Sequence, residues 1–164
     1  MASKESKSKK GQSGHQASIN LQYLRHKVEK YLAEYEMPNT ANERGEYVLR
    51  RGNTAIVLSV SESPDGLSFV DLTAVMGKDQ LPKCKNDEQL YKALLYANVT
   101  DELGKFALVD SHLQVKYRLL GNDLDRDELG YSVLILLKQA EHVQERVQMA
   151  IESTKQLAAA GKKK

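Results

Sequence analysis

The acidic segment at residues 122–128 comes nearest to a recognisable binding chemistry. Its sequence, Asn-Asp-Leu-Asp-Arg-Asp-Glu, places carboxylates at alternate positions, and alternating carboxylates can surround a calcium ion. A calcium loop also needs glycine at its sixth position and a bidentate glutamate at its twelfth. Counted from Asp123, those positions hold Glu128 and Leu134, so the spacing argues against a metal site. The same residues fit a helix start, with Asp125 as N-cap and Glu128 three residues later.

The remaining reactive side chains do not form a catalytic set. Four histidines are spread along the chain, none of them four residues from another or next to the single cysteine: His15, His26, His112 and His142. Zinc spacing is therefore missing. Cys84 lies between Lys83 and Lys85, which could lower the pKa of its thiol, but a lone cysteine is weak evidence for a nucleophile. We predict a protein that is not an enzyme and has no catalytic residue, no metal and no cofactor.

The net charge of +2 hides an uneven distribution. Residues 1–17 hold four lysines and one glutamate, which gives +3, and the lysines at 162–164 give another +3. Residues 18–160 therefore carry 2 − 6 = −4. A dedicated nucleic-acid-binding domain would have its basic patch on the folded surface. We expect disordered basic tails at 1–17 and 158–164, able to make weak, salt-sensitive contacts with nucleic acid.

The sequence also bears on the compartment. Apolar runs stay well short of the roughly 18 residues that a membrane span needs. The first 16 residues have no apolar stretch after their lysines, so they do not resemble a secretory signal. One cysteine cannot form an internal disulfide, which fits a reducing environment. These features predict a cytoplasmic protein with no membrane association.

Three helices are predicted from apolar residues that recur at steps of three and four. The first follows Ser18 as N-cap and is stopped by Pro38. The second starts at Asn86, with Gln89 as its capping-box partner, and runs to about Leu103. The third is a long C-terminal helix that starts after Asp125 and frays at residues 158–160.

Five short strands are predicted between the helices. They cover 46–51, 54–61, 67–76, 105–109 and 112–119, with turns at 51–53, 63–66 and 110–111. Both faces of the third strand contain large apolar residues: Leu67, Phe69 and Val75 on one, Val70, Leu72 and Met76 on the other. Such a strand needs cover on its second face, either from a second subunit or client, or from the first and last helices.

The second half of the chain resembles the bacterial YbjN-like family, which shares the fold of type III secretion chaperones. The resemblance lies in Leu94-Leu95-Tyr96-Ala97-Asn98, in Gly104 to Asp110, in His112 to Leu119, and in the terminal helix that follows. The order of elements matches over residues 18–157. The resemblance implies one α+β domain of order α-β-β-β-α-β-β-α, with an antiparallel sheet packed against helices. It also implies a homodimer that binds a segment of another protein.

The sequence thus favours a protein-binding chaperone or adaptor, and its predicted partners are an unidentified protein client and a second copy of the chain. The predicted partner-binding residues are Val70, Leu72, Ala74, Met76, Tyr117 and Leu119. Pairing of the client with an edge strand would add to this binding. The alternative is an accessory factor for nucleic-acid transactions, for example one associated with DNA repair or a single-strand-binding protein, tethered by the lysine-rich tails.

Overall fold

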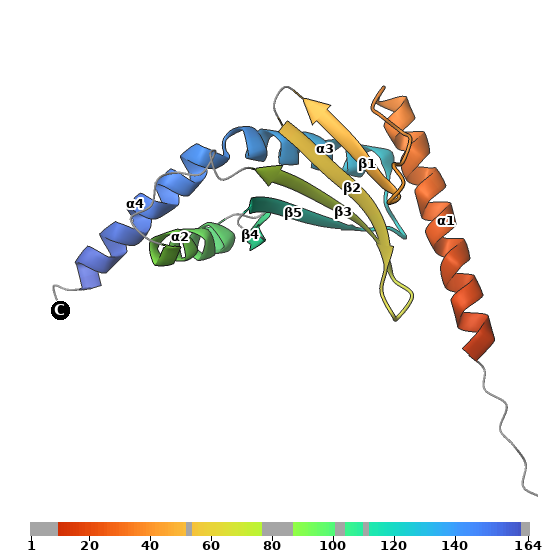
Figure 1. Ribbon diagram of the computed structural model, residues 1–164, viewed down its shortest axis with the longest axis horizontal. Helices are drawn as coiled ribbons and strands as arrows, with labels where there is room; N and C mark the ends of the chain where they lie inside the picture. The colour runs from red at the N-terminus through yellow and green to blue at the C-terminus, as the bar shows by residue number, and fades with distance from the viewer. Residues whose placement is uncertain (1–9, 52–53, 77–86, 101–103, 110–111, 162–164) are drawn as a thin grey trace, which may run out of the picture.

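The computed structural model describes residues 10–51, 54–76, 87–100, 104–109 and 112–161, and it has an α+β fold (Figure 1). The elements are α1 (Lys10–Glu34), β1 (Glu46–Arg51), β2 (Thr54–Glu62), β3 (Ser68–Met76), α2 (Asp87–Thr100), β4 (Lys105–Val109), β5 (His112–Leu120), α3 (Arg126–Glu141) and α4 (Val143–Gly161). The predicted fold class is confirmed, with the last predicted helix divided into α3 and α4. None of the helices in the described ranges is long and apolar enough to cross a membrane.

The five strands form one antiparallel sheet in the order β1-β2-β3-β5-β4. Side chains alternate between the two faces, so the register collects the apolar residues on one of them. Leu58 lies opposite Leu72, and Leu72 lies opposite Tyr117 on the next strand. Ile56, Leu58, Leu72, Val115 and their neighbours on this face are buried.

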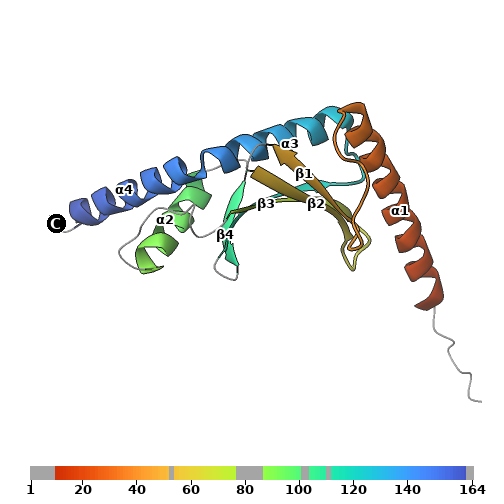
Figure 2. The same cartoon turned by 45° about the horizontal axis from the view of Figure 1, so that its top comes forward.

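In Figure 2, α3 lies across this face of the sheet and α1 stands at the end of the strands, and both helices contribute to the same core. Leu24, Val28 and Leu32 of α1 are buried in the core, as are Leu129, Val133 and Leu136 of α3. The sequence left open whether a partner or the first and last predicted helices cover the strand faces. These helices cover this face. The opposite face, which we call the open face, is covered by no described helix; its central side chains are Val57, Ser59, Asp71, Thr73, Val75, Lys105, Lys116 and Arg118.

A bend at His142 separates α3 from α4. The backbone N–H of His142 donates to the carbonyls of Lys138 and Ala140. His142 is the C-cap of α3, and its φ and ψ are −103° and 12°. No proline or glycine lies at this point, and beyond it α4 runs past the sheet and packs against α2 (Figure 1). Val147 and Ala150 of α4 and Leu94 of α2 are buried in this region.

The bounds of α1 differ from the prediction at both ends. The helix begins at Lys10 rather than after Ser18, so it extends into the segment expected to lack order. It ends at Glu34, four residues before Pro38. Glu36 has a positive φ of 55°, and the N–H of Met37 donates to the carbonyl of Leu32 at 2.9 Å. This is the pattern of a Schellman cap, which closes a helix without help from proline.

Candidate functional site

The predicted partner-binding residues lie in the core of the chain. Val70, Leu72 and Ala74 are 0% exposed, and Met76 and Leu119 are 4% exposed. Tyr117 is half-buried on the same side. The choice of face is thus corrected: α1 and α3 cover the face from which these side chains project, although Leu72 and Tyr117 also line the hollow described below. Alternation shows which residues of a strand share a face, but it does not show on which side the helices lie, so the sequence could not decide between the two.

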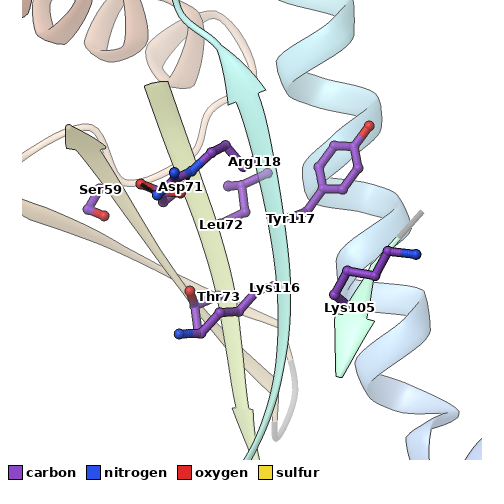
Figure 3. Close-up of a pocket in the computed structure, with 8 residues that line it drawn as sticks. All are labelled: Ser59, Asp71, Leu72, Thr73, Lys105, Lys116, Tyr117 and Arg118. Carbon is purple, nitrogen blue, oxygen red and sulfur yellow. Dashed lines mark hydrogen bonds and ion pairs between the residues drawn. The ribbon is translucent and has the colours of Figure 1, made fainter. Parts of the chain in front are cut away.

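The open face carries polar rows that cross the sheet from strand to strand. Ser59, Asp71 and Arg118 are paired across β2, β3 and β5. The next row contains Thr73, Lys116 and Lys105 across β3, β5 and β4. Figure 3 shows these side chains over the strands, with Tyr117 pointing to the other side, toward α3.

Asp71 and Arg118 form the centre of the first row. The guanidinium donates to the carboxylate of Asp71 through Nε at 2.6 Å and through Nη2 at 3.1 Å. Ser61 Oγ donates to the same carboxylate at 2.8 Å. The hydrogen bond and the charge of Asp71 raise the pKa of Arg118 above its usual range, so the guanidinium stays charged. It also lies 4.8 Å from the ring centre of Phe69, within the range of a cation–π contact.

Lys116 and Lys105 lie directly opposite each other on β5 and β4, and both are exposed. Lys105 Nζ donates to the backbone carbonyl of Asn98 at 2.9 Å. The two side chains extend in opposite directions, with Lys116 reaching over β3 toward Thr73 (Figure 3). Because the two side chains diverge, the ammonium group of Lys116 lies over the hollow while that of Lys105 is hydrogen-bonded at its rim.

These two rows line a hollow of about 510 Å³ on the open face. The lining residues are Ser59, Asp71, Leu72, Thr73, Lys105, Lys116, Tyr117 and Arg118. Hydroxyl groups, one carboxylate and three cations therefore surround a concave surface that has no nucleophile paired with a base. The site is suited to binding and not to acid–base or covalent chemistry.

Asparagine side chains form hydrogen bonds with main-chain groups of both edge strands of the sheet. At β4, Asn98 Nδ2 donates to the carbonyl of Phe106 at 2.9 Å, and the N–H of Phe106 donates to Asn98 Oδ1 at 2.6 Å. At β1, the N–H of Glu46 donates to Asn42 Oδ1 at 3.0 Å, and the N–H of Asn42 donates to the carbonyl of Glu46 at 2.8 Å. Sequence reasoning noted Asn98 as a family feature but missed this contact. An amide on the helix that directly precedes an edge strand is the signal that could have shown it.

A second exposed feature lies on α2. Tyr91, Leu95 and Val99 are spaced four residues apart, so they form one stripe along the helix. Their exposed fractions are 49%, 67% and 85%. Met149 of α4 is also exposed, at 59%. A contiguous apolar stripe of this kind on a surface helix is typical of a contact with another chain.

The acidic segment has a structural role in the described part of the chain. Asp125 is the N-cap of α3, and its Oδ1 accepts from the N–H of Glu128 at 2.7 Å, as predicted. Asp127 accepts hydrogen bonds from Arg126 and from the hydroxyl of Tyr35, and these bonds lower the pKa of its carboxyl. Within the ranges that the structure describes, no three His, Cys, Asp or Glu residues are grouped so that they could hold a metal ion.

Some predicted features lie outside the described residues. They are Cys84 with Lys83 and Lys85, the cap at Asn86, the turns at 52–53 and 110–111, and the chain ends at 1–9 and 162–164. The turn at 63–66 is described and confirmed. Gly66 has a φ of 80°, which favours glycine, and its N–H donates to the carbonyl of Ser63 at 2.9 Å.

The one-sided five-stranded sheet with its flanking helices has the fold of the type III secretion chaperones. The chain is similar in structure to SycH, a type III secretion chaperone of Yersinia pestis that was solved in complex with a stable fragment of YscM2. The TM-score is 0.53 at 19% sequence identity, and the match covers 71% of this chain and 96% of that chain. No family model matches the sequence, and no curated protein sequence matches it.

Proposed function

We propose that the chain is a non-enzymatic, cytoplasmic chaperone or adaptor of the YbjN-like kind that binds a segment of a partner protein. The observation that carries the proposal is a secretion-chaperone fold in which no helix of the described residues covers one face of the sheet. A hollow lined by side chains from several strands is available on that face. Binding of an extended segment on such a surface needs no reactive group, which agrees with the chemistry of the site.

A homodimer is part of this proposal, and α2 is the surface that supports it. Burying the stripe of Tyr91, Leu95 and Val99 against a second copy would remove apolar area from water at about 25 cal/mol per Å². A two-fold axis allows the same stripe to serve both subunits. We expect Leu95→Asp to convert a dimer to a folded monomer, measured by light scattering after gel filtration. Gln148→Asp on the exposed side of α4 is the matched control and should leave the dimer intact.

The binding function is tested with the full chain as bait in a nuclease-treated lysate of the source organism. A client should be recovered near stoichiometry and should form a purified complex on co-expression. In that complex, the client segment should be soluble only when the bait is present. Recovery of no protein, with capture of nucleic acid alone from untreated lysate, would contradict the proposal and favour the accessory role in nucleic-acid transactions.

A further inference from the structure

Positive charge gathers on the open face of a chain whose body is acidic. This face carries four cations, Arg50, Lys105, Lys116 and Arg118, and two carboxylates, Glu46 and Asp71, so its formal charge is 4 − 2 = +2. Residues 18–160 together carry −4, so the rest of this body carries −4 − 2 = −6. A partner of negative charge is therefore repelled by most of the body and attracted to this face.

Lys116 is the residue of this face best placed to receive an anion. It is exposed at the centre of the hollow, between Thr73 on β3 and Lys105 on β4. Its side chain makes no hydrogen bond or ion pair with the residues that the structure describes. Arg118 lies on the same strand and face and uses two of its five donors on Asp71, which leaves others available.

We propose that this hollow binds an acidic, extended segment of the client, with a carboxylate of the segment on Lys116. The inference rests on the proposed chaperone function and names the chemistry of its client. Ser59 and Thr73 supply hydroxyl groups for the backbone of the segment, and Val75, which is 44% exposed, supplies apolar contact beside them. The chain's own tails are basic and are repelled from this site.

The charge pattern favours a peptide over a nucleic acid. A nucleic acid places phosphates at close, regular intervals and needs a row of cations to neutralise them. In this hollow the carboxylate of Asp71 lies between the cations and is held there by Arg118 and Ser61. A peptide can place a carboxylate at Lys116 and an uncharged residue at Asp71, which a phosphate backbone cannot do.

The test uses the full-length protein and fluorescein-labelled ten-residue peptides, with binding measured by fluorescence anisotropy. One peptide alternates glutamate with valine, a second has glutamine in place of glutamate, and a third has lysine. Decathymidylate serves as the nucleic-acid probe. The protein variants are Lys116→Glu, Lys116→Arg and, as a matched control of equal charge change on an exposed face of α3, Lys138→Glu.

We expect wild type to bind the glutamate peptide more tightly than the other peptides. Lys116→Glu should weaken binding of the glutamate peptide by about tenfold or more, because it replaces a favourable charge contact with a repulsive one. Lys116→Arg should preserve binding, and Lys138→Glu should change it less than twofold. The lysine peptide should bind Lys116→Glu more tightly than it binds wild type. Equal weakening in Lys116→Glu and Lys138→Glu would overturn the proposal, as would tighter binding of decathymidylate than of the glutamate peptide.

The failure of this inference can be told from failure of the proposed function. If a client purified as described above binds Lys116→Glu as tightly as wild type, the chaperone function stands and the acidic-segment site is wrong. If no client forms a complex with wild type, the function itself fails. Circular dichroism of each variant tests whether a loss of binding comes from a loss of folded structure.

Discussion

The ring of Tyr35 lies directly against Gly130, so α1 and α3 meet where one of them has no side chain. A Cβ added at Gly130 would lie 2.5 Å from Cζ of Tyr35 and 2.6 Å from its hydroxyl oxygen. The hydroxyl continues to Asp127 Oδ1, 3.1 Å away and about one turn earlier on α3. The contact therefore fixes the end of α1 on the first turns of the helix that covers the sheet.

We expect Gly130→Ala to lower the free energy of unfolding by about 1–3 kcal/mol, because the added methyl must displace the Tyr35 ring. In a Tyr35→Ala background the same change should instead be neutral or stabilising by up to about 1 kcal/mol, since alanine is the better helix former. A double-mutant cycle measured by urea unfolding gives the coupling directly. Equal effects of Gly130→Ala in the two backgrounds would show that the ring contact does not matter.

The orientation of the sheet can be tested by two neighbouring substitutions. Leu72 is 0% exposed in the core, so Leu72→Ala should cost about 2–5 kcal/mol and Leu72→Asp should unfold the chain, because an unpaired charge would be buried. Val75 on the open face is 44% exposed, and Val75→Asp should leave a folded protein with a loss of about 1 kcal/mol or less. Circular dichroism with thermal unfolding compares them. A folded Leu72→Asp protein would contradict the assignment of this face to the core.

Much of this fold could be predicted from sequence, and the exceptions have physical reasons. The strands 46–51 and 105–109 were predicted at their observed bounds, because loop and turn residues such as Gly45, Gly52 and Gly104 lie next to their ends in the sequence. The bend at His142 was not predicted, because no proline or glycine marks it in the sequence. Which face of β3 is open depends on where two helices distant in the sequence come to lie. The site was missed for the same reason: Asp71, Lys105 and Lys116 come together only through strand pairing.

Tyr47 should make stability depend on alkaline pH. Burial, together with the hydrogen bond from its hydroxyl to Glu29 Oε1 at 2.9 Å, raises its pKa to about 12. The folded pKa is above the ordinary value of about 10, so the neutral phenol stabilises the fold fully below pH 10 or so. That contribution is lost as pH rises from about 10 toward 12, because the unfolded state ionises first.

Tyr47→Phe should therefore cost about 1 kcal/mol at pH 7 and flatten the decline of stability between about pH 10 and 12. Urea unfolding across this range provides the measurement. Tyr23→Phe, at a side chain that is 68% exposed, is the control and should follow wild type. A Tyr47→Phe curve parallel to wild type at high pH would mean that this phenol is not the responsible group.

The end of α1 offers a stabilising substitution. Glu36 adopts a positive φ of 55°, where a side chain is strained and glycine is not. We expect Glu36→Gly to raise the free energy of unfolding by about 1 kcal/mol. Gln22→Gly, at an exposed position inside α1, should lower it by a similar amount, about 1 kcal/mol. If both substitutions destabilise the protein equally in thermal unfolding, the cap does not limit its stability.

The asparagine contacts at the two edges of the sheet bear on how this protein behaves at high concentration. An edge strand with unpaired main-chain N–H and C=O groups can pair with strands of other molecules, and repeated pairing of this kind leads to fibrous aggregates. Here Asn42 and Asn98 hydrogen-bond to main-chain groups of Glu46 and Phe106, so a strand that adds at those two residues must first displace these bonds. These contacts therefore hinder the pairing of a second copy of the chain at those two residues of its edge strands.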